Sequence, residues 1–358
     1  MLVSEKSSYP LELYQAVCIL EQLVLEKLFR RHFGQAVESI TPLKGDGSDR
    51  RIYRLKSSTR SVIGIMGDHR AENEAFIKFS RHFYRHGLPV PEIYATHLDE
   101  GIYLEQDLGY ETLFEWMSRI REKDGFSEQI LDLYRQTLAW LPHFQITAGQ
   151  SLDYSYCYQH ASFAWDSMQW DLQYFRHRFL ELFYKRPLDK TALQKDFDNL
   201  VHFLLEEKAD FFLYRDFQSR NVMVVDNKPY FIDYQSGRRG ALQYDVASLL
   251  YDAKANIPEK NRQELLMHYI SSVNKVHPID ADRFMRYFYG FVLIRIMQAF
   301  GAYGYLAGVR GKKRFLKSVP FAISNIELLL TRDTFLKNTP TLRNIFEALV
   351  TDSSLREF

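Results

Sequence analysis

The sequence reads Phe211-Phe212-Leu213-Tyr214-Arg215-Asp216-Phe217-Gln218-Ser219-Arg220-Asn221 at the point that decides the fold. An apolar run follows (Val222–Val225), then a polar turn (226–229) and a second apolar run that ends at Asp233. Two short apolar runs around a turn of this composition predict a hairpin. The hairpin would return Asp233 to the neighbourhood of Asn221, so that both side chains converge with Asp216 at the edge of an apolar floor.

Two carboxylates and one carboxamide in this arrangement suit phosphoryl transfer. Asp216 can orient an attacking hydroxyl and accept its proton. The oxygens of Asn221 and Asp233 are ligands that Mg²⁺ prefers. An Arg-Asp pair, an Asn five residues later and an Asp at the end of a strand form the pattern of a kinase catalytic loop. Each residue alone would more often cap a turn or end a strand, and it is their common order and spacing that favour a site.

The chain outside this segment changes pattern near residue 107. Strand-like runs come first, at Ser39–Leu43, 51–55, Ser61–Met66, 92–96 and 102–105, with a helical pattern over 70–86. Later patterns are mostly helical, at 112–121, 127–144, 163–183, 193–207 and from 243 onward. We therefore expect an α+β, protein-kinase-like fold of two lobes. Its predicted parts are a helical extension (1–35), a β-rich N-lobe (36–107) and a helical C-lobe (108–358).

Composition excludes several classes of function. The 358 residues include 46 basic and 45 acidic side chains, and this balance produces no field that would attract nucleic acid or an acidic membrane surface. The two cysteines form no C-x-x-C pair, so neither a disulfide framework nor a structural zinc site is expected. The first helical pattern (11–29) is interrupted by polar residues, and no run approaches the roughly 20 apolar residues of a membrane span. We expect a cytoplasmic protein without nucleic-acid or membrane partners.

The catalytic-loop segment, the strand end Phe231-Ile232-Asp233-Tyr234-Gln235 and the later run Tyr244-Asp245-Val246-Ala247-Ser248-Leu249-Leu250 together resemble the aminoglycoside phosphotransferase/choline kinase-like family. The resemblance extends over about residues 36 to 330, although only the catalytic segment is highly specific. The motif Arg-Asp-Phe-Gln-Ser-Arg-Asn is most similar to that of bacterial kinases of cell-wall amino sugars. These phosphorylate N-acetylmuramate or N-acetylglucosamine at the anomeric hydroxyl.

The resemblance implies a role for each matching position. Asp216 would be the catalytic base, and Asn221 and Asp233 the Mg²⁺ ligands of an ATP-dependent enzyme. Further roles are implied for three groups of residues: Gly45, Gly47 and Ser48 over the nucleotide phosphates, Glu105 and Asp107 in the connector that pairs with adenine, and Arg215, Gln218 and Asp245 in support of the catalytic loop. The helices before the loop would bind a small-molecule acceptor such as a sugar, with Asp171 and Arg176 as candidates, although ordinary helix packing explains the same residues.

One feature departs from the kinase pattern. Protein kinases place a Lys on the third strand, paired with a helix Glu, whereas the strand Ser61–Met66 has no Lys. Lys44, Arg50, Arg51 and Arg54 are candidates for the missing charge, and Glu72 and Glu74 for the helix acid; we assign Arg51 and Glu74 to the nucleotide site. Three alternatives remain: a kinase for aminoglycosides or choline, a non-catalytic nucleotide-binding pseudokinase, and a protein kinase. The last is disfavoured because no Asp-Phe-Gly or Ala-Pro-Glu motif follows.

Overall fold

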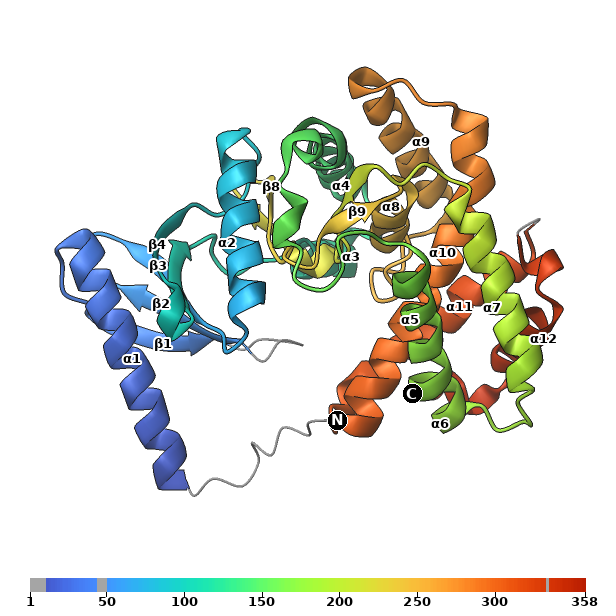
Figure 1. The fold of residues 1–358 in the computed structure, drawn as a ribbon, viewed down its shortest axis with the longest axis horizontal. Helices are drawn as coiled ribbons and strands as arrows, with labels where there is room; N and C mark the ends of the chain where they lie inside the picture. The colour runs from blue at the N-terminus through green and yellow to red at the C-terminus, as the bar shows by residue number, and fades with distance from the viewer. Residues whose placement is uncertain (1–10, 44–49, 333–334) are drawn as a thin grey trace.

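A computed structural model describes residues 11–43, 50–332 and 335–358 and shows two lobes (Figure 1). The N-lobe contains a five-stranded antiparallel sheet in the order β1-β2-β3-β5-β4. Its strands are β1 (Ser39–Leu43), β2 (Arg51–Lys56), β3 (Ser61–Met66), β4 (Ile93–His97) and β5 (Ile102–Gln106). These bounds differ by at most one residue from the predicted strands, and the two-lobed α+β fold is confirmed.

Helix α1 (Leu11–Phe33) packs on one face of this sheet. Leu25 and Phe29 share a buried cluster with Leu55 and with residues of β3 and β5. Gly64 permits this close approach, because a Cβ at that position would lie 2.7 Å from Leu55 Cδ1 and 2.9 Å from Leu25 Cδ2. The described C-terminal half of α1, within the segment predicted as an extension, thus forms one core with the sheet.

Helix α2 (Arg70–Arg85) joins the N-lobe to the C-lobe. Its buried side chains, Phe76 and Phe83 among them, belong to the same apolar core as the C-lobe helices. The ring of Phe76 stacks on Tyr234 with centroids 5.1 Å apart, and Ser80 Oγ lies 2.6 Å from the Tyr234 hydroxyl. Tyr234 directly follows Asp233, so this contact fixes α2 beside the predicted site.

The C-lobe is mostly helical. Its longer helices are α3 (Leu113–Asp124), α4 (Glu128–Pro142), α5 (Trp165–Phe175), α7 (Lys190–Leu205), α8 (Gln243–Leu250), α9 (Glu259–Val276), α10 (Ala281–Gly304), α11 (Val319–Leu330) and α12 (Pro340–Thr351). Two predicted helices change form before their expected ends, because α4 passes into a π-helical turn at His143–Ala148 and α5 into another at Arg176–Leu180. The lobe also contains two short antiparallel strand pairs: β6 (Phe211–Leu213) with β9 (Arg238–Gly240), and the hairpin of β7 (Val222–Val225) with β8 (Lys228–Phe231).

Helix α10 and the π-helical turn that follows it form one apolar segment, Ala281–Val309. Contrary to the sequence-based expectation, this segment is long and apolar enough to cross a membrane by length and composition, as one helix in the described part of the chain. About 56% of its most apolar window is buried inside the protein, where α10 packs against α5 and α8. Such contacts are those of a core helix, and length and composition alone are weak grounds for a membrane span.

Candidate active site

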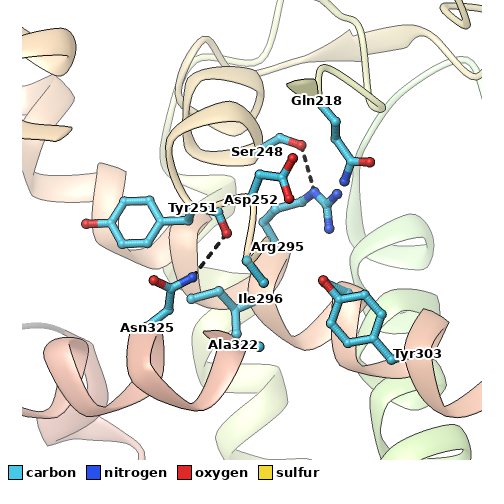
Figure 2. A pocket seen from close by; sticks show the side chains of 11 residues that line it. Gln218, Ser248, Tyr251, Asp252, Arg295, Ile296, Tyr303, Ala322 and Asn325 are labelled. Carbon is cyan, nitrogen blue, oxygen red and sulfur yellow. Dashed lines mark hydrogen bonds between the residues drawn. The ribbon is translucent and has the colours of Figure 1, made fainter. Parts of the chain in front are cut away.

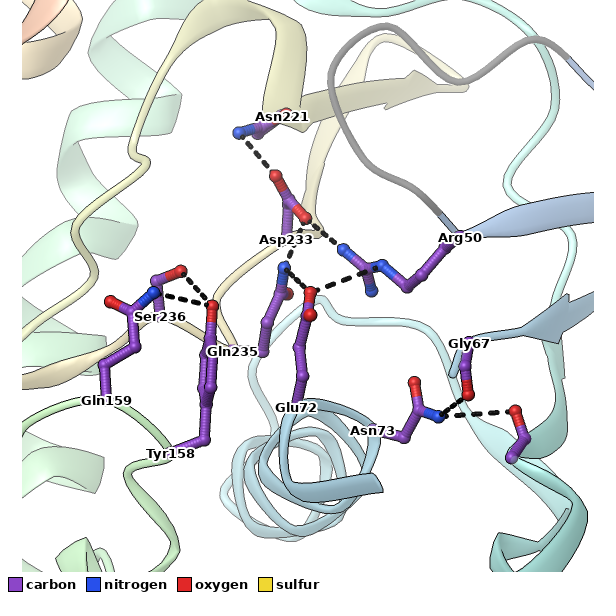
Figure 3. Close-up of polar contacts among 11 residues, drawn as sticks. Arg50, Gly67, Glu72, Asn73, Tyr158, Gln159, Asn221, Asp233, Gln235 and Ser236 are labelled. Atoms are coloured by element: carbon purple, nitrogen blue, oxygen red, sulfur yellow. Dashed lines mark hydrogen bonds and ion pairs between the residues drawn. The ribbon is translucent and has the colours of Figure 1, made fainter. Parts of the chain in front are cut away.

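The β7–β8 hairpin brings the two predicted metal ligands together. Asp226 and Asn227 both have positive φ values, 50° and 57°, which are the backbone angles of a two-residue type I′ turn. The returning strand places Asp233 Oδ2 3.3 Å from Asn221 Nδ2, and the same amide donates a hydrogen bond to the backbone oxygen of Asp216 at 2.9 Å. The three predicted residues therefore converge, as Figure 3 shows for Asn221 and Asp233.

The backbone of the catalytic loop is strained, and hydrogen bonds to Asp245 stabilise it. Arg215 has a φ of 81°, a conformation that costs a non-glycine residue energy and persists where the surroundings hold it. The fully buried Asp245 accepts hydrogen bonds from the backbone N–H groups of Tyr214 at 2.8 Å and Arg215 at 3.0 Å, and from Gln145 at 3.0 Å. Burial raises the pKa of Asp245 to about 7, against the opposing effect of these hydrogen bonds.

The side chain of Arg215 is tied to Asp171 rather than to a ligand site. The two form a bidentate ion pair, with distances of 2.7 Å and 2.5 Å, and Arg215 also donates to the Tyr244 hydroxyl at 2.7 Å. Asp171 has no exposed surface. Its assignment to the substrate site is therefore not supported: it serves as the counterion of the arginine that precedes Asp216. Arg176, the other candidate, contacts the neighbouring His177, and none of its described contacts joins it to the loop.

Asp233 is the centre of a polar network (Figure 3). Its backbone also has a positive φ, 70°, and the carbonyl of the preceding Ile232 accepts a hydrogen bond from Tyr214 Oη at 2.5 Å. Oδ1 accepts hydrogen bonds from Arg50 Nη2 and from Gln235 Nε2, each at 2.7 Å. The carboxylate is thus oriented on both sides, while its side chain stays 36% exposed.

Arg50 connects this network to α2. Its Nε lies 3.6 Å from Glu72 Oε1, and Gln235 Nε2 lies 3.4 Å from the same oxygen. Glu105, on β5, is 8% exposed, and burial raises its pKa to about 8; Arg50 opposes this effect and Asp233 adds to it. One basic side chain therefore lies among three acids from β5, α2 and the C-lobe.

The two residues that we assigned to this position lie elsewhere. Arg51 turns away and pairs with Glu21 of α1 at 2.6 Å and with Asp68 at 3.1 Å. Successive residues of a strand point to opposite faces, so Arg50 and Arg51 cannot both face the site. Glu74 follows Glu72 by two residues, about 200° around the helix, and no described contact brings it to Arg50.

The connector between the lobes is fixed by a buried ion pair. Arg54 donates to both oxygens of Asp107 at 2.7 Å, and Asp107 also accepts from Ser61 and from the backbone of Gly109. These contacts use both carboxylate oxygens of Asp107. Any pairing of the connector with adenine would therefore come from its backbone rather than from this side chain. The backbone of Glu105 pairs with Ile63 in the sheet. Gly45, Gly47 and Ser48 lie outside the described residues.

Asp216 lies in a mixed electrostatic environment. Desolvation and the neighbouring Asp233 raise its pKa above the usual value, whereas Arg215, Arg295 and Arg238 act to lower it. Gln218, predicted to support the loop, accepts a hydrogen bond from the N–H of Asn221 through its backbone oxygen, and it lines a cavity with Arg295 (Figure 2).

Asn221 and Asp233, the two residues predicted as Mg²⁺ ligands, both carry side-chain oxygens at this site. The carboxylate of Asp233 and the amide oxygen of Asn221 are hard donors of the kind that Mg²⁺ takes. Here Asn221 turns its amide nitrogen toward Asp233, so its side chain would have to rotate for both oxygens to bind one cation. The described chain has no cluster of three or more His, Cys, Asp or Glu side chains suited to a metal.

Sequence reasoning missed Gln235 and Arg295. Gln235 lies within the segment that carried the resemblance, two residues after Asp233, but nothing in its type marks it as an orienting group. Arg295 had a signal, because it is the one charged residue in the buried apolar run 291–297 of α10. A charge in such a run is costly and therefore marks a function or a partner.

The two-lobed fold and the site between the lobes define a kinase of the phosphotransferase type, and comparison with known proteins agrees. Residues 39–279 match the phosphotransferase enzyme family, and the chain belongs to that family. It is 25% identical over 328 residues to the N-acetylmuramate/N-acetylglucosamine kinase of Pseudomonas aeruginosa, covering 89% of this chain and 92% of that protein. A protein of the same name from Neisseria meningitidis is 28% identical over 130 residues, which cover 36% of this chain and 39% of that protein.

Solved structures show the same fold at low sequence identity. A choline kinase from Streptococcus pneumoniae is 15% identical with a TM-score of 0.54, covering 84% of this chain and 98% of that one. An ethanolamine kinase from Plasmodium vivax is 12% identical with a TM-score of 0.60, covering 90% and 91%. These likenesses show the fold. The family match and the likeness to the Pseudomonas aeruginosa kinase over nearly its whole length identify the protein as a small-molecule kinase.

Proposed function

We propose that the protein uses Mg-ATP to phosphorylate a hydroxyl of an N-acetylated amino sugar, N-acetylmuramate or N-acetylglucosamine. The observation that carries this proposal is the convergence of Asp216, Asn221 and Asp233 on one oriented network. The amino-sugar assignment is supported by the likeness to the Pseudomonas aeruginosa enzyme, which spans nearly the whole length of both proteins. The presence of all three polar groups in one cluster argues against a non-catalytic pseudokinase.

The residues divide the work of phosphoryl transfer. Asp216 holds the acceptor hydroxyl and takes its proton as the oxygen attacks. Asn221 and Asp233 would hold Mg²⁺, which supplies charge neutralisation at the phosphate oxygens when bound. Asp245 and the Arg215–Asp171 pair keep the loop in its strained conformation, so that the base is positioned before substrate arrives.

Arg50 takes the place of the missing strand lysine. It lies beside both the metal ligand Asp233 and the helix acid Glu72. In protein kinases the strand lysine likewise pairs with a helix glutamate and binds the nucleotide phosphates from the N-lobe, beside the metal site. The positive charge therefore comes from the residue before β2 rather than from β3.

The surroundings of Asp216 favour a neutral or acidic acceptor over a cationic one. Arg238 and Arg295 are both buried near this carboxylate, and a cationic aminoglycoside or choline would meet their repulsion. For this reason we rank the amino sugars above the cationic alternatives.

The test is ADP release from Mg-ATP with a panel of acceptors: N-acetylmuramate, N-acetylglucosamine, glucose, choline and an aminoglycoside. We expect turnover with the N-acetylated sugars, and a decrease of about 10²–10⁴-fold in Asp216→Ala, the usual range for loss of a general base. Asp210→Ala is the matched control, because Asp210 is exposed and lies six residues before the base. Turnover with choline or the aminoglycoside alone would refute the amino-sugar assignment, and equal rates in Asp216→Ala and wild type would remove Asp216 from the mechanism.

A further inference from the structure

Two arginines near the catalytic base are buried without an acidic partner. Arg238 is 3% and Arg295 5% exposed, and within the described ranges no carboxylate lies at ion-pair distance from either. Arg215, by contrast, has Asp171 as its counterion. A buried charge without a counterion is costly, and the fold nevertheless retains two such cations whose charge acts on Asp216.

The contacts of these arginines distinguish them. Arg238 donates to three neutral oxygens, those of the Ser236 backbone, Ser167 and Gln159. Arg295 donates from Nε to Ser248 Oγ at 2.9 Å and from Nη1 to Gln298 Oε1 at 2.7 Å. Its Nη2 has no hydrogen-bond partner among the residues that the structure describes. Arg295 thus has a donor group available. The acid that lines the same cavity, Asp252, accepts from Ser219 Oγ at 2.6 Å and makes no ion pair with Arg295 in the described structure.

Arg295 also lines a cavity (Figure 2). Gln218 of the catalytic loop, two residues after the base, lines the same cavity, together with Ser248, Asp252, Tyr303 and Asn325. None of Arg50, Glu72, Asn221 and Asp233 does so. The cavity therefore lies among the C-lobe helices behind Gln218 and shares no residue with the nucleotide network. We infer that it belongs to the acceptor side of the loop. It is small, so it would take a substituent of the acceptor and not the sugar ring.

We propose that Arg295 binds an acidic substituent of the acceptor and makes the enzyme prefer an acidic amino sugar over its neutral counterpart. This inference rests on the proposed function and deepens it. N-acetylmuramate differs from N-acetylglucosamine by a lactyl ether that ends in a carboxylate. That group would supply the counterion that Arg295 lacks and accept from its planar donor fork, a pairing that arginine forms well.

The test compares kcat/KM for N-acetylmuramate, its neutral methyl ester and N-acetylglucosamine. The wild-type enzyme should prefer the acid to the ester by about 10- to 100-fold, the range of a hydrogen bond to a charged group. Arg295→Gln should lose about the same factor for N-acetylmuramate and little for the ester or N-acetylglucosamine, and Arg295→Lys should keep part of the preference. Arg286→Gln, on the same helix with a 63% exposed side chain, is the matched control and should keep the full preference.

Each result decides the inference. Equal losses for all three acceptors in Arg295→Gln would show that Arg295 acts on the base or the transferred phosphate, and would overturn the proposal. The ester comparison needs no variant, so it decides the matter even where a substitution impairs folding: equal rates for acid and ester would also overturn it. Phosphorylation of the sugars without discrimination leaves the proposed function standing. Phosphorylation of neither sugar would overturn both.

Discussion

Arg50 donates a hydrogen bond to Asp233 at 2.7 Å between Nη2 and Oδ1, across 183 residues of sequence. The contact joins the first residue before β2 to the strand end in the C-lobe, and Glu72 of α2 lies on the other side of the guanidinium. A single ionic contact therefore couples the nucleotide-facing part of the N-lobe to the proposed metal ligand.

Replacing Arg50 should weaken the use of ATP. Arg50→Ala should lower kcat/KM for ATP by about 10- to 100-fold, the effect of removing a charged hydrogen-bond donor, and leave KM for the sugar nearly unchanged. Arg50→Lys should retain part of the activity because the charge remains. Steady-state kinetics with varied ATP measure this. Arg51→Ala is the control, since Arg51 pairs with α1 and Asp68; an equal loss in both variants would contradict the role of Arg50.

Asp233 should make nucleotide binding depend on Mg²⁺. Calorimetric titration of a non-hydrolysable ATP analogue should show tighter binding with Mg²⁺ than with EDTA for the wild-type protein. In Asp233→Ala the two affinities should become equal, because a carboxylate ligand is lost. Asp216→Ala should keep the difference, since Asp216 acts on the acceptor. A retained metal effect in Asp233→Ala would move the ligand role to another residue.

The sequence predicted those features of the structure that depend on residues close together in the chain. The sheet and the convergence of Asp216, Asn221 and Asp233 depend on alternation, a two-residue turn and short spacings, all of which are local. The sequence did not indicate that Arg50 rather than Arg51 lies beside Asp233, because this depends on which face of the sheet α1 covers. Asp171 was misassigned for a similar reason: its partner Arg215 lies 44 residues away, and only the packing of α5 against the loop brings them together.

The buried pair of Asp171 and Arg215 should be important for stability. Asp171→Ala would leave the guanidinium buried without a counterion, and we expect the free energy of unfolding to fall by about 3–5 kcal/mol. Urea denaturation followed by tryptophan fluorescence measures this change. The exposed pair of Arg119 and Glu111 is a matched comparison, with side chains 52% and 37% exposed. Glu111→Ala should cost less than about 1 kcal/mol, and similar losses for the two variants would mean that burial does not decide the strength of the Asp171 contact.

Asp245 should affect stability in a way that depends on pH. Asp245→Asn removes one acceptor for the backbone N–H groups of Tyr214 and Arg215, which should cost about 1–3 kcal/mol at low pH. The pKa of Asp245 is about 7 in the folded protein, above its ordinary value of 3.8. Between these values the unfolded chain loses its proton and the folded chain keeps it, so the stability that Asp245 contributes is fully present below pH 3.8 and declines as the pH rises to about 7.

The asparagine variant cannot titrate at this position. The difference in unfolding free energy between wild type and Asp245→Asn should therefore fall from pH 5 to pH 7 and level off only above about pH 8, because the carboxyl is still half protonated at its pKa of about 7. Urea denaturation at these pH values measures the difference, with the exposed Asp210→Asn as the control that should show no such trend. A difference that grows with pH would mean that the carboxylate is ionised in the folded protein at low pH. In that case the three hydrogen bonds to Asp245, rather than its burial, would determine the protonation state of its carboxyl group.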